Sequence, residues 1–340
     1  MKAGNRHKAI GTSTKAKVFC FAISAILFAL SFSVEAQQHA KIPLIGFLGA
    51  TSPSSVTERT EALRQGLREL GYIEGKNIVI DWRYANGKAG QLPALAAELV
   101  RQRVDVIVTQ GSTSTRAAQR ATRTVPIVMT ATADPVAEGI IASLAQPGGN
   151  ITGLTTLAPE LSGKRLELLK EAVPKASRVA VFFNPETVST TSRWKEIETA
   201  AQPLELKLQP LEVRTPEDFA GAFKAAKKES AQAVIVFRVA VFTTHRERLI
   251  NLASENKLPA MYELREFVEA GGLMSYSAHE AANYRRAAHY VDRILKGAKP
   301  ADMAVEQPTK FELWVNLRAA KQIGLTIPPN VLARADKVIR

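Results

Sequence analysis

Small and polar residues gather in this sequence directly after apolar, strand-like runs, whereas recognisable catalytic motifs are absent. The sequence contains no GxSxG, GxxxxGK[ST], GxGxxG or HExxH pattern. The spacing of His279 and His289 does not place them on one helix face, which argues against a zinc site. We therefore expect a non-enzyme with no metal and no cofactor. A Ser-His-Asp site assembled from distant segments stays open, because geometry rather than sequence order defines such a triad.

In the N-terminal half, loops after apolar runs offer hydrogen-bonding groups to a ligand. Ser52 follows the first run, Gly111, Ser112 and Thr113 follow the third, and Asp134 follows the fourth. Ligands of open α/β sheets bind at the carboxyl ends of the strands, so we expect these five residues at a ligand site. Backbone amides and hydroxyls at the start of a helix can receive an anion such as a carboxylate. The alternative for these loops, and for Asp134 in particular, is an ordinary helix cap.

The C-terminal half adds four candidate ligand-binding residues in equivalent positions. Asn184, Arg238, Tyr262 and Tyr276 each follow or end an apolar run. Aromatic rings and a guanidinium that face a cleft can sandwich a ring or hold a carboxylate. The alternatives are packing at the rim for the two tyrosines and a solvent-facing charge for Arg238.

From residue 41 onwards, strand-like runs alternate with helical patterns. The expected strands are residues 43–48, 77–84, 104–108, 126–129, 151–154, 178–183, 204–211, 233–237, 259–262, 272–276 and 311–315. The expected helices are residues 58–70, 92–101, 112–122, 135–144, 163–173, 191–201, 279–296 and 316–324, with another opening at 215–218. This alternation predicts βαβ units and parallel sheets. Because it restarts after QPGGN at 146–150, we expect an α/β fold with two similar lobes.

Residues 1–36 have the pattern of a secretory signal peptide that is cleaved near Ala36. Five basic residues precede the apolar run at 18–32, and small residues stand at Val34 and Ala36. The run is shorter than the roughly 20 residues of a spanning helix, which disfavours the alternative of an uncleaved anchor. We therefore expect the mature chain to be exported across the inner membrane.

The composition limits the remaining function classes. The chain has 340 residues, 45 Lys and Arg against 32 Asp and Glu, and 46% hydrophobic residues. Its one cysteine, Cys20, lies in the predicted signal peptide, so a core of about 300 residues must stabilise the mature protein without disulfides. An exported basic chain is poorly placed to meet nucleic acid, and we assign its charge to solubility and attraction to anionic surfaces.

Several long motifs resemble those of periplasmic solute-binding proteins of ABC importers, in the branch that includes tryptophan-binding lipoproteins. They are TVPIVM at 124–129, ADPV at 133–136, QPGGNITG at 146–153, LPAMY at 258–262, GGLMSY at 271–276, ILKGAKPAD at 294–302 and GLTIPP at 324–329. The resemblance covers roughly residues 40–340.

The resemblance implies a type I periplasmic-binding-protein fold, an α/β fold in which two doubly wound, Rossmann-like lobes are joined by a hinge of three crossovers. These would fall near Thr155, near Ser277 and near residues 300–308. The first lobe would comprise 40–155 plus 279–300, and the second 156–278 plus 301–340. Family ligand contacts map onto Ser52, Ser112, Thr113, Asp134, Asn184, Tyr262 and Tyr276 of this sequence.

Two departures from the family pattern bear on the ligand. Arg238-Val239 stands where the family often has an acidic residue followed by proline, and Ser275-Tyr276-Ser277 stands where many members have SYG. The solute can therefore differ from the aromatic amino acids that the resemblance suggests. Arg238 favours a solute that carries a carboxylate.

The resemblance implies a monomer that delivers a small solute to a membrane permease and its ATPase subunits, and that meets the membrane only through the permease. A binding subunit for a membrane sensor is the main alternative. An exported enzyme on the same scaffold would need acid and base groups converging in the cleft. A LacI-like regulator shares the fold but needs an N-terminal helix-turn-helix, where this sequence has an export signal.

Overall fold

The computed structural model describes residue 1 and residues 41–340, and residues 43–340 form one compact unit. Apart from residue 1, the predicted signal peptide lies outside the described residues. Within the described part of the chain, no helix is both long and apolar enough to cross a membrane.

The first lobe is built on a sheet of five parallel strands in the order β2-β1-β3-β4-β5. The strands are β1 (Leu44–Gly49), β2 (Val79–Tyr84), β3 (Val106–Thr109), β4 (Ile127–Thr132) and β5 (Ile151–Thr155). All residues of β3, β4 and β5 are buried. Continuous burial of this kind follows from helices covering both faces of a parallel sheet.

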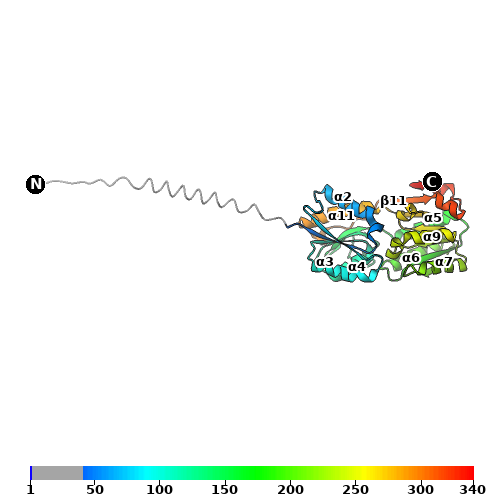
Figure 1. The fold of residues 1–340 in the computed structure, drawn as a ribbon, viewed down its shortest axis with the longest axis horizontal. Coiled ribbons are helices and arrows are strands. Elements are labelled where there is room, and N and C mark those ends of the chain that lie inside the picture. The colour runs from blue at the N-terminus through cyan, green and yellow to red at the C-terminus, as the bar shows by residue number, and fades with distance from the viewer. Residues whose placement is uncertain (2–40) are drawn as a thin grey trace. The chain divides into compact units, whose positions relative to one another are not determined.

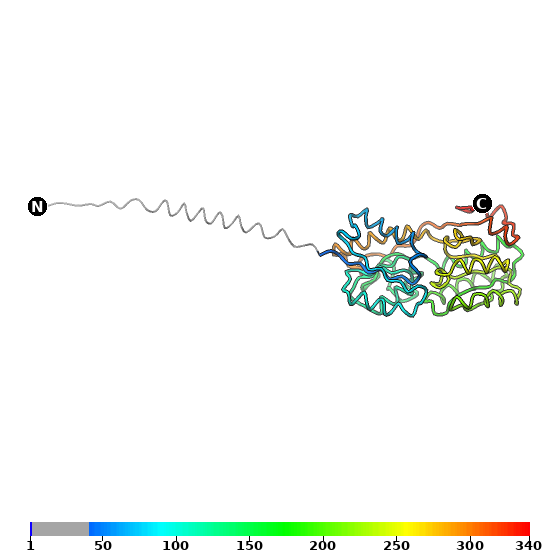
Figure 2. Tube along the Cα trace, viewed as in Figure 1, coloured from blue at the N-terminus to red at the C-terminus, as the bar shows by residue number. Residues whose placement is uncertain are grey.

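Helices from two distant parts of the chain cover this sheet. They are α2 (Thr57–Glu69), α3 (Leu92–Arg101), α4 (Gly111–Ala121) and α11 (Glu280–Leu295), with 3-10 turns η1 (Pro53–Val56) and η2 (Ala89–Gln91). Helix α11 packs against α2, and Figure 2 shows its orange segment among the blue and cyan segments of this lobe. Tyr284, Ala287, Ala288 and Val291 on one face of α11 are fully buried in the same cluster as Ile45 and Phe47 of β1.

The second lobe is built on seven strands in the order β12-β11-β10-β9-β8-β6-β7. They are β6 (Arg178–Phe183), β7 (Lys207–Glu212), β8 (Ala233–Val236), β9 (Ala260–Tyr262), β10 (Met274–Ala278), β11 (Phe311–Asn316) and β12 (Lys337–Ile339). All pairings are parallel except that of β10 with β11. The last segment of the chain therefore completes this second sheet.

The helices of the second lobe lie on both faces of its sheet (Figure 1). They are α5 (Glu160–Ala172), α6 (Thr190–Ala201), α7 (Asp218–Lys228), α8 (Ala240–Thr244), α9 (Arg246–Glu255), α10 (Arg265–Glu269), α12 (Leu317–Ile323) and α13 (Pro329–Ala333). Two separate hydrophobic clusters result, one on each side of the sheet. Together the two lobes confirm the expected doubly wound α/β fold.

The chain passes between the lobes at three places, and hydrogen bonds tie the first of them to the third and to helix α11. They follow β5, follow β10, and lie between η3 (Pro300–Asp302) and β11. The amide of Thr155 donates to the carbonyl of Glu306 at 3.0 Å, and the side chain of Asn283 donates to the carbonyl of Thr155 at 3.1 Å. Short adjacent segments of this kind can act as a hinge, because a few residues absorb the change in backbone angles.

The helix expected at residues 135–144 is wrong, because the structure has only hydrogen-bonded turns there. The amides of Ile140 and Ile141 both bond back to the carbonyl of Pro135. Gly139 adopts a positive φ of 64°, which ends the first turn and directs the two isoleucines into the core. The sequence pattern showed the apolar residues but not this left-handed glycine.

Helix α12 depends on one side-chain cap, which gives a first stability prediction. Asn316 Oδ1 accepts hydrogen bonds from the amides of Arg318 at 3.0 Å and Ala319 at 3.1 Å. We expect Asn316→Ala to lower the free energy of unfolding by about 1–2 kcal/mol, because two helix amides lose their acceptor. Urea denaturation followed by circular dichroism measures this. Asn316→Ser retains an acceptor and should recover most of the loss; equal losses for both variants would contradict the capping role.

Candidate functional site

A cavity of about 50 Å³ lies between the two lobes and is lined by both of them. The first lobe contributes the ends of β1, β3 and β4, and the second contributes the loop after β6, helix α6 and the start of α8. The lining residues are Ala50, Thr51, Gln110, Gly111, Ser112, Thr113, Ala131, Ala133, Thr187, Ser189, Arg193, Arg238, Val239, Ala240 and Thr243. Its position agrees with the rule that ligands bind beyond the carboxyl ends of parallel strands.

The first-lobe wall is the N-terminus of α4, whose opening amides are not capped by a side chain of the described residues. Gly111 begins this helix with a φ of 73°, a conformation that favours glycine. Gln110 fixes the adjoining loop, because its Oε1 accepts from the amide of Ala50 at 3.1 Å and its Nε2 donates to Thr51 Oγ1 at 3.0 Å. Uncapped amides at a helix N-terminus form a site suited to an anion.

The second-lobe wall carries two guanidinium groups, those of Arg193 and Arg238. Arg193 is only 3% exposed, and its Nη1 donates to the backbone carbonyl of Arg238 at 2.9 Å. Its Nη2 lies 3.6 Å from Glu263, whereas its buried Nε has no hydrogen-bond partner among the described residues. Arg238 is paired with Glu280 of the first lobe.

The charge on Arg193 is poorly compensated. Burial lowers the pKa of its guanidinium, Glu263 opposes this effect, and the neighbouring charge of Arg238 lowers the pKa further. Arg165, which is also buried, flanks Glu263 on the other side at 3.6 Å, and burial likewise lowers its pKa. This part of the cleft therefore has an electrostatic environment that favours an incoming negative charge.

Ion pairs join the lobes beside the cavity. Arg59 of α2 donates through Nε to Glu266 of α10 at 2.9 Å and through Nη1 to Glu280 of α11 at 2.9 Å. Arg59 and Glu280 are 1% and 7% exposed. Nearby, Arg265 of α10 pairs with Glu58 of α2. These contacts hold the second lobe against α2. The groups of Arg59, Glu266 and Glu280 are largely removed from water, whereas Glu58 is exposed.

Four of the predicted ligand-binding residues come together at this cavity, namely Gly111, Ser112, Thr113 and Arg238. The hydroxyl of Ser112 is already occupied, because it donates to Glu138 at 2.8 Å and accepts from the amide of Ala133 at 3.1 Å. Arg238 is not the solvent-facing charge of the alternative interpretation, since its side chain is 13% exposed and paired with Glu280.

Three other predicted residues lie in the loops around the cavity but are not part of its lining. Ser52 shares a hydrogen bond of 2.7 Å with the hydroxyl of Ser55. Asp134 accepts from the amide of Ala137 at 3.0 Å, and Asn184 accepts from the amide of Glu186 at 2.8 Å. The side chains of Asp134 and Asn184 thus close local turns. For Asp134 this is not the helix cap of the alternative interpretation, because no helix follows it before β5. From the first loop, Thr51 lines the cavity instead of Ser52.

The two predicted tyrosines lie away from the cavity, which corrects the expectation that they face the cleft. Tyr262 is 1% exposed and stacks on Phe267 with ring centroids 4.6 Å apart. Tyr276 lies in β10 with its ring 6.1 Å from that of Phe311 on the neighbouring strand β11. Side chains alternate between the faces of a strand, and the pleat directs both rings into packing contacts.

Three buried charged residues at or beside the cavity were not expected from the sequence. Arg59, Arg193 and Glu280 each precede apolar residues at spacings of four and eight: Leu63 and Leu67, Ile197 and Ala201, Tyr284 and Ala288. All of these apolar residues are buried. A charged residue on the apolar stripe of a helix was therefore the available signal, because such a residue is buried only with a partner.

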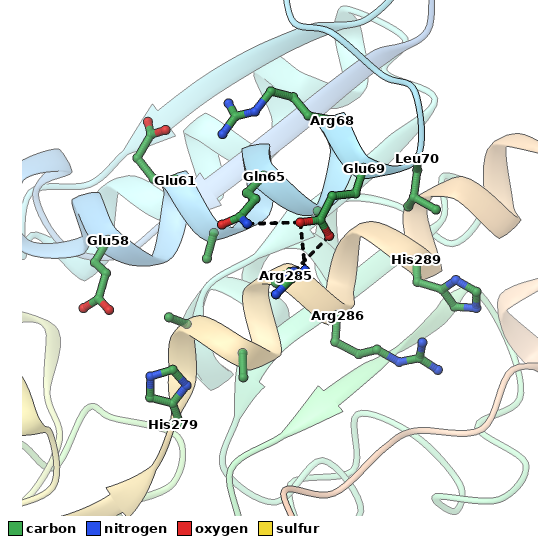
Figure 3. Close-up of a pocket in the computed structure, with 14 residues that line it drawn as sticks. Glu58, Glu61, Gln65, Arg68, Glu69, Leu70, His279, Arg285, Arg286 and His289 are labelled. Carbon is green, nitrogen blue, oxygen red and sulfur yellow. Dashed lines mark hydrogen bonds and ion pairs between the residues drawn. The ribbon is translucent and has the colours of Figure 1, made fainter.

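A larger hollow of about 670 Å³ lies on the first lobe between α2 and α11 (Figure 3). Gly66 lets these helices approach, because a Cβ there would lie 2.5 Å from the carbonyl oxygen of Arg285. Across the hollow, Glu69 accepts from Arg285 at 2.8 and 2.9 Å and from Gln65 at 3.0 Å. These groups satisfy one another at an open surface, whereas in the lining of the interlobe cavity the buried Nε of Arg193 has no partner among the described residues.

Among residues 41–340, no cluster of three or more histidine, cysteine, aspartate or glutamate residues is arranged to hold a metal ion.

A family model for ABC transporter substrate-binding proteins matches residues 34–339 of the sequence. The chain belongs to this family. Its members are typically extracytoplasmic and work with an ABC permease, and the homologues are substrate-binding proteins rather than enzymes.

Individual relatives agree with this assignment. A tyrosine-binding protein of Clostridioides difficile (strain R20291) is 25% identical over 290 residues, which span 83% of this chain and 81% of that protein. A conserved domain protein of Vibrio cholerae has a TM-score of 0.83 at 29% identity, covering 88% of this chain and all of that one. An ABC domain from Streptococcus pneumonia in complex with L-Trp has a TM-score of 0.81 at 24% identity, covering 87% and 99% of the two chains.

Proposed function

We propose that this protein is the periplasmic solute-binding component of an ABC importer. It captures a small solute, carboxylate-bearing or aromatic, in the cavity between the lobes and presents it to a membrane permease. The observation that carries the proposal is that one cavity is lined by the first lobe's α4 N-terminus and the second lobe's Arg193 and Arg238. A solute held by both lobes stabilises the closed arrangement over an open one.

The hinge and the lobe boundaries belong to the same proposal. We assign residues 40–155 plus 279–300 to the first lobe and 156–278 plus 301–340 to the second. The packing of α11 on α2 and the pairing of β11 with β10 support this division. Residues 301–306 depart from it, because Met303 and Val305 are buried in clusters of the first lobe. Opening about the three crossovers would enlarge the cavity, which at about 50 Å³ is too small to admit an amino-acid-sized solute from solution.

Thermal denaturation of the chain from residue 37 onwards, against a panel of small solutes, tests the binding function. The panel includes tyrosine and tryptophan, because relatives bind them, together with carboxylic acids and sugars. At 100 to 1,000 times Kd, a ligand should add about 2.7–4.1 kcal/mol and raise Tm by several degrees. A compound recovered unchanged supports capture, whereas a chemically altered one indicates an enzyme. A panel without any shift contradicts the proposal.

The remaining alternative, a binding subunit for a membrane sensor, is separated from import by transport itself. Proteoliposomes that contain the permease and ATPase subunits should accumulate the solute only when the binding protein and ATP are present. Binding without transport in such vesicles would favour the sensor.

A further inference from the structure

The lining of the interlobe cavity is cationic. Of its residues, Arg193 and Arg238 carry a charge, and none of the described lining residues is an aspartate or glutamate. A zwitterionic amino acid needs an acceptor for its ammonium group as well as donors for its carboxylate, because burying an unpaired charge is costly. The charged lining residues can therefore pair with the carboxylate of an amino acid but not with its ammonium group.

Three carboxylates lie near the cavity but do not line it, and both oxygens of Glu263 and Oε2 of Glu138 have no hydrogen-bond partner among the described residues. Both oxygens of Glu280 are paired, one with Arg59 and the other with Arg238. Glu263 lies between the guanidinium groups of Arg165 and Arg193. Glu138 accepts from Ser112 at 2.8 Å and from the amide of Asp134 at 3.3 Å, and burial raises its pKa, which disfavours the negative form. Since none of these three carboxylates lines the cavity, an ammonium group inside it would meet no acidic acceptor among the described lining residues.

Two independent features offer donors to an anion. One is the uncapped N-terminus of α4 at Gly111, Ser112 and Thr113. The other is Arg193, a residue 97% removed from solvent whose Nε lacks a partner among the described residues. A buried donor without a partner costs free energy that a bound acceptor would recover. Both features face the same cavity from opposite lobes, so an anion would bridge the lobes.

We propose that the solute is a compact carboxylate without an ammonium group, held between Arg193 with Arg238 and the N-terminus of α4. This inference rests on the proposed binding function and specifies its substrate class. The lobes close on the negative charge, and the absence of aspartate and glutamate from the described cavity lining discriminates against α-amino acids.

Titration calorimetry with matched pairs of probes tests the substrate class on the unmodified chain from residue 37. The pairs are succinate with L-aspartate, 3-phenylpropanoate with L-phenylalanine, and 3-(4-hydroxyphenyl)propanoate with L-tyrosine. In at least one pair, the acid without the amino group should bind at least about tenfold more tightly, the effect of one unsatisfied charged group.

The outcomes separate this inference from the function on which it rests. If an amino acid binds more tightly than the matched acid without the amino group, or if only a neutral sugar binds, the carboxylate proposal is overturned. The proposal of solute capture is not affected by either result. No binding of any probe, together with no Tm shift across the wider panel, overturns both.

Variants then locate the carboxylate. We expect Arg193→Gln to weaken binding of the preferred acid about tenfold to a hundredfold, because a charged donor is lost. Arg193→Lys should regain part of the affinity, and Lys195→Gln, on the exposed face of the same helix, should bind as the parent does. If Arg193→Gln does not fold, Arg238→Gln is measured in its place, because Arg238 is less buried. Unchanged affinity in the folded variants would overturn the assignment.

Discussion

Replacing Arg59 by methionine should lower the free energy of unfolding by about 3–5 kcal/mol, because the variant leaves buried carboxylates without their partner. Arg59 is 1% exposed and bonds both Glu266 and Glu280. Methionine fills similar space but neutralises neither charge. Urea denaturation at pH 7, followed by tryptophan fluorescence, measures the difference.

Arg68→Met is the matched control, since Arg68 lies on the exposed face of the same helix. It should change the stability by less than about 0.5 kcal/mol. Adding Glu266→Gln to Arg59→Met should restore part of the loss, because it removes one uncompensated carboxylate. If Arg59→Met is as stable as the parent, the interlobe ion pairs do not hold the lobes together.

Acidification should reduce the difference in the free energy of unfolding between the parent and Arg59→Met. Burial opposes ionisation of Glu266, but the charges of Arg59, Arg238 and Arg265 outweigh it and lower the pKa of this carboxyl below 4.5. A lowered folded-state pKa contributes stability above the unfolded-state value, and this contribution is lost as the pH falls through the folded-state value. In the variant, burial without Arg59 favours the protonated form, so acid relieves part of its destabilisation. If this difference in the free energy of unfolding stays constant below about pH 4.5, the destabilisation does not come from the ionised Glu266.

Gly153→Ala should destabilise the first lobe by about 3–5 kcal/mol, the range of severe steric and backbone conflicts. Gly153 has a φ of 127°, and a Cβ there would lie 2.2 Å from the carbonyl oxygen and 2.6 Å from the nitrogen of Met129. Backbone atoms of β4 cannot move away without breaking the pairing with β5. The carbonyl of Gly153 also accepts from the amide of Glu306 in the third crossover, so the defect reaches the hinge.

Gly221→Ala is the control, and we expect it to stabilise the protein when Tm and the urea midpoint are measured in the same way. This glycine lies in α7 with no atom within 4 Å of an added Cβ and no positive φ. Alanine there should stabilise the protein by about 0.5–1 kcal/mol through its helix propensity. A Gly153→Ala protein that matches the parent in Tm and in urea midpoint would show that β4 and β5 can separate at little cost.

The closing of the lobes combines two kinds of contact with different consequences. The Arg59 ion pairs join the lobes without a solute, whereas Arg193 has a donor that the protein itself leaves unused. We expect the first kind to set the stability of the closed arrangement and the second to set its dependence on the solute. The Arg59 and Arg193 variants therefore separate closure from recognition.

Local pattern determined most of the fold. Alternating apolar runs and amphipathic segments placed β1 to β11 and most helices correctly, because a strand in a covered parallel sheet must be apolar along its length. The segment at 135–144 failed, because its apolar residues fit a helix but Gly139 adopts a left-handed conformation that the pattern does not show.

The sequence pattern predicted only part of the candidate site. Loops after strands are positioned by the sheet, so Gly111, Ser112, Thr113 and Arg238 could be named in advance. Tyr262 could not be placed, because its orientation depends on the pleat of β9 and on packing against Phe267. Arg193 and Arg59 were missed because each lies inside a helix, outside the loops in which ligand contacts are usually sought.

The sequence by itself determined the family, the two α/β lobes and the order of their elements, since these follow from hydrophobic periodicity and motifs along the chain. Only the tertiary structure decided which charges meet in the cleft. Arg59 precedes its partners Glu266 and Glu280 by more than 200 residues along the chain. Arg193 contacts Glu263, which lies on another element of the second lobe. Whether a buried charge is paired or left to receive a solute depends on such distant contacts, because electrostatic energies in a desolvated site are set by distance and burial and not by order in the sequence.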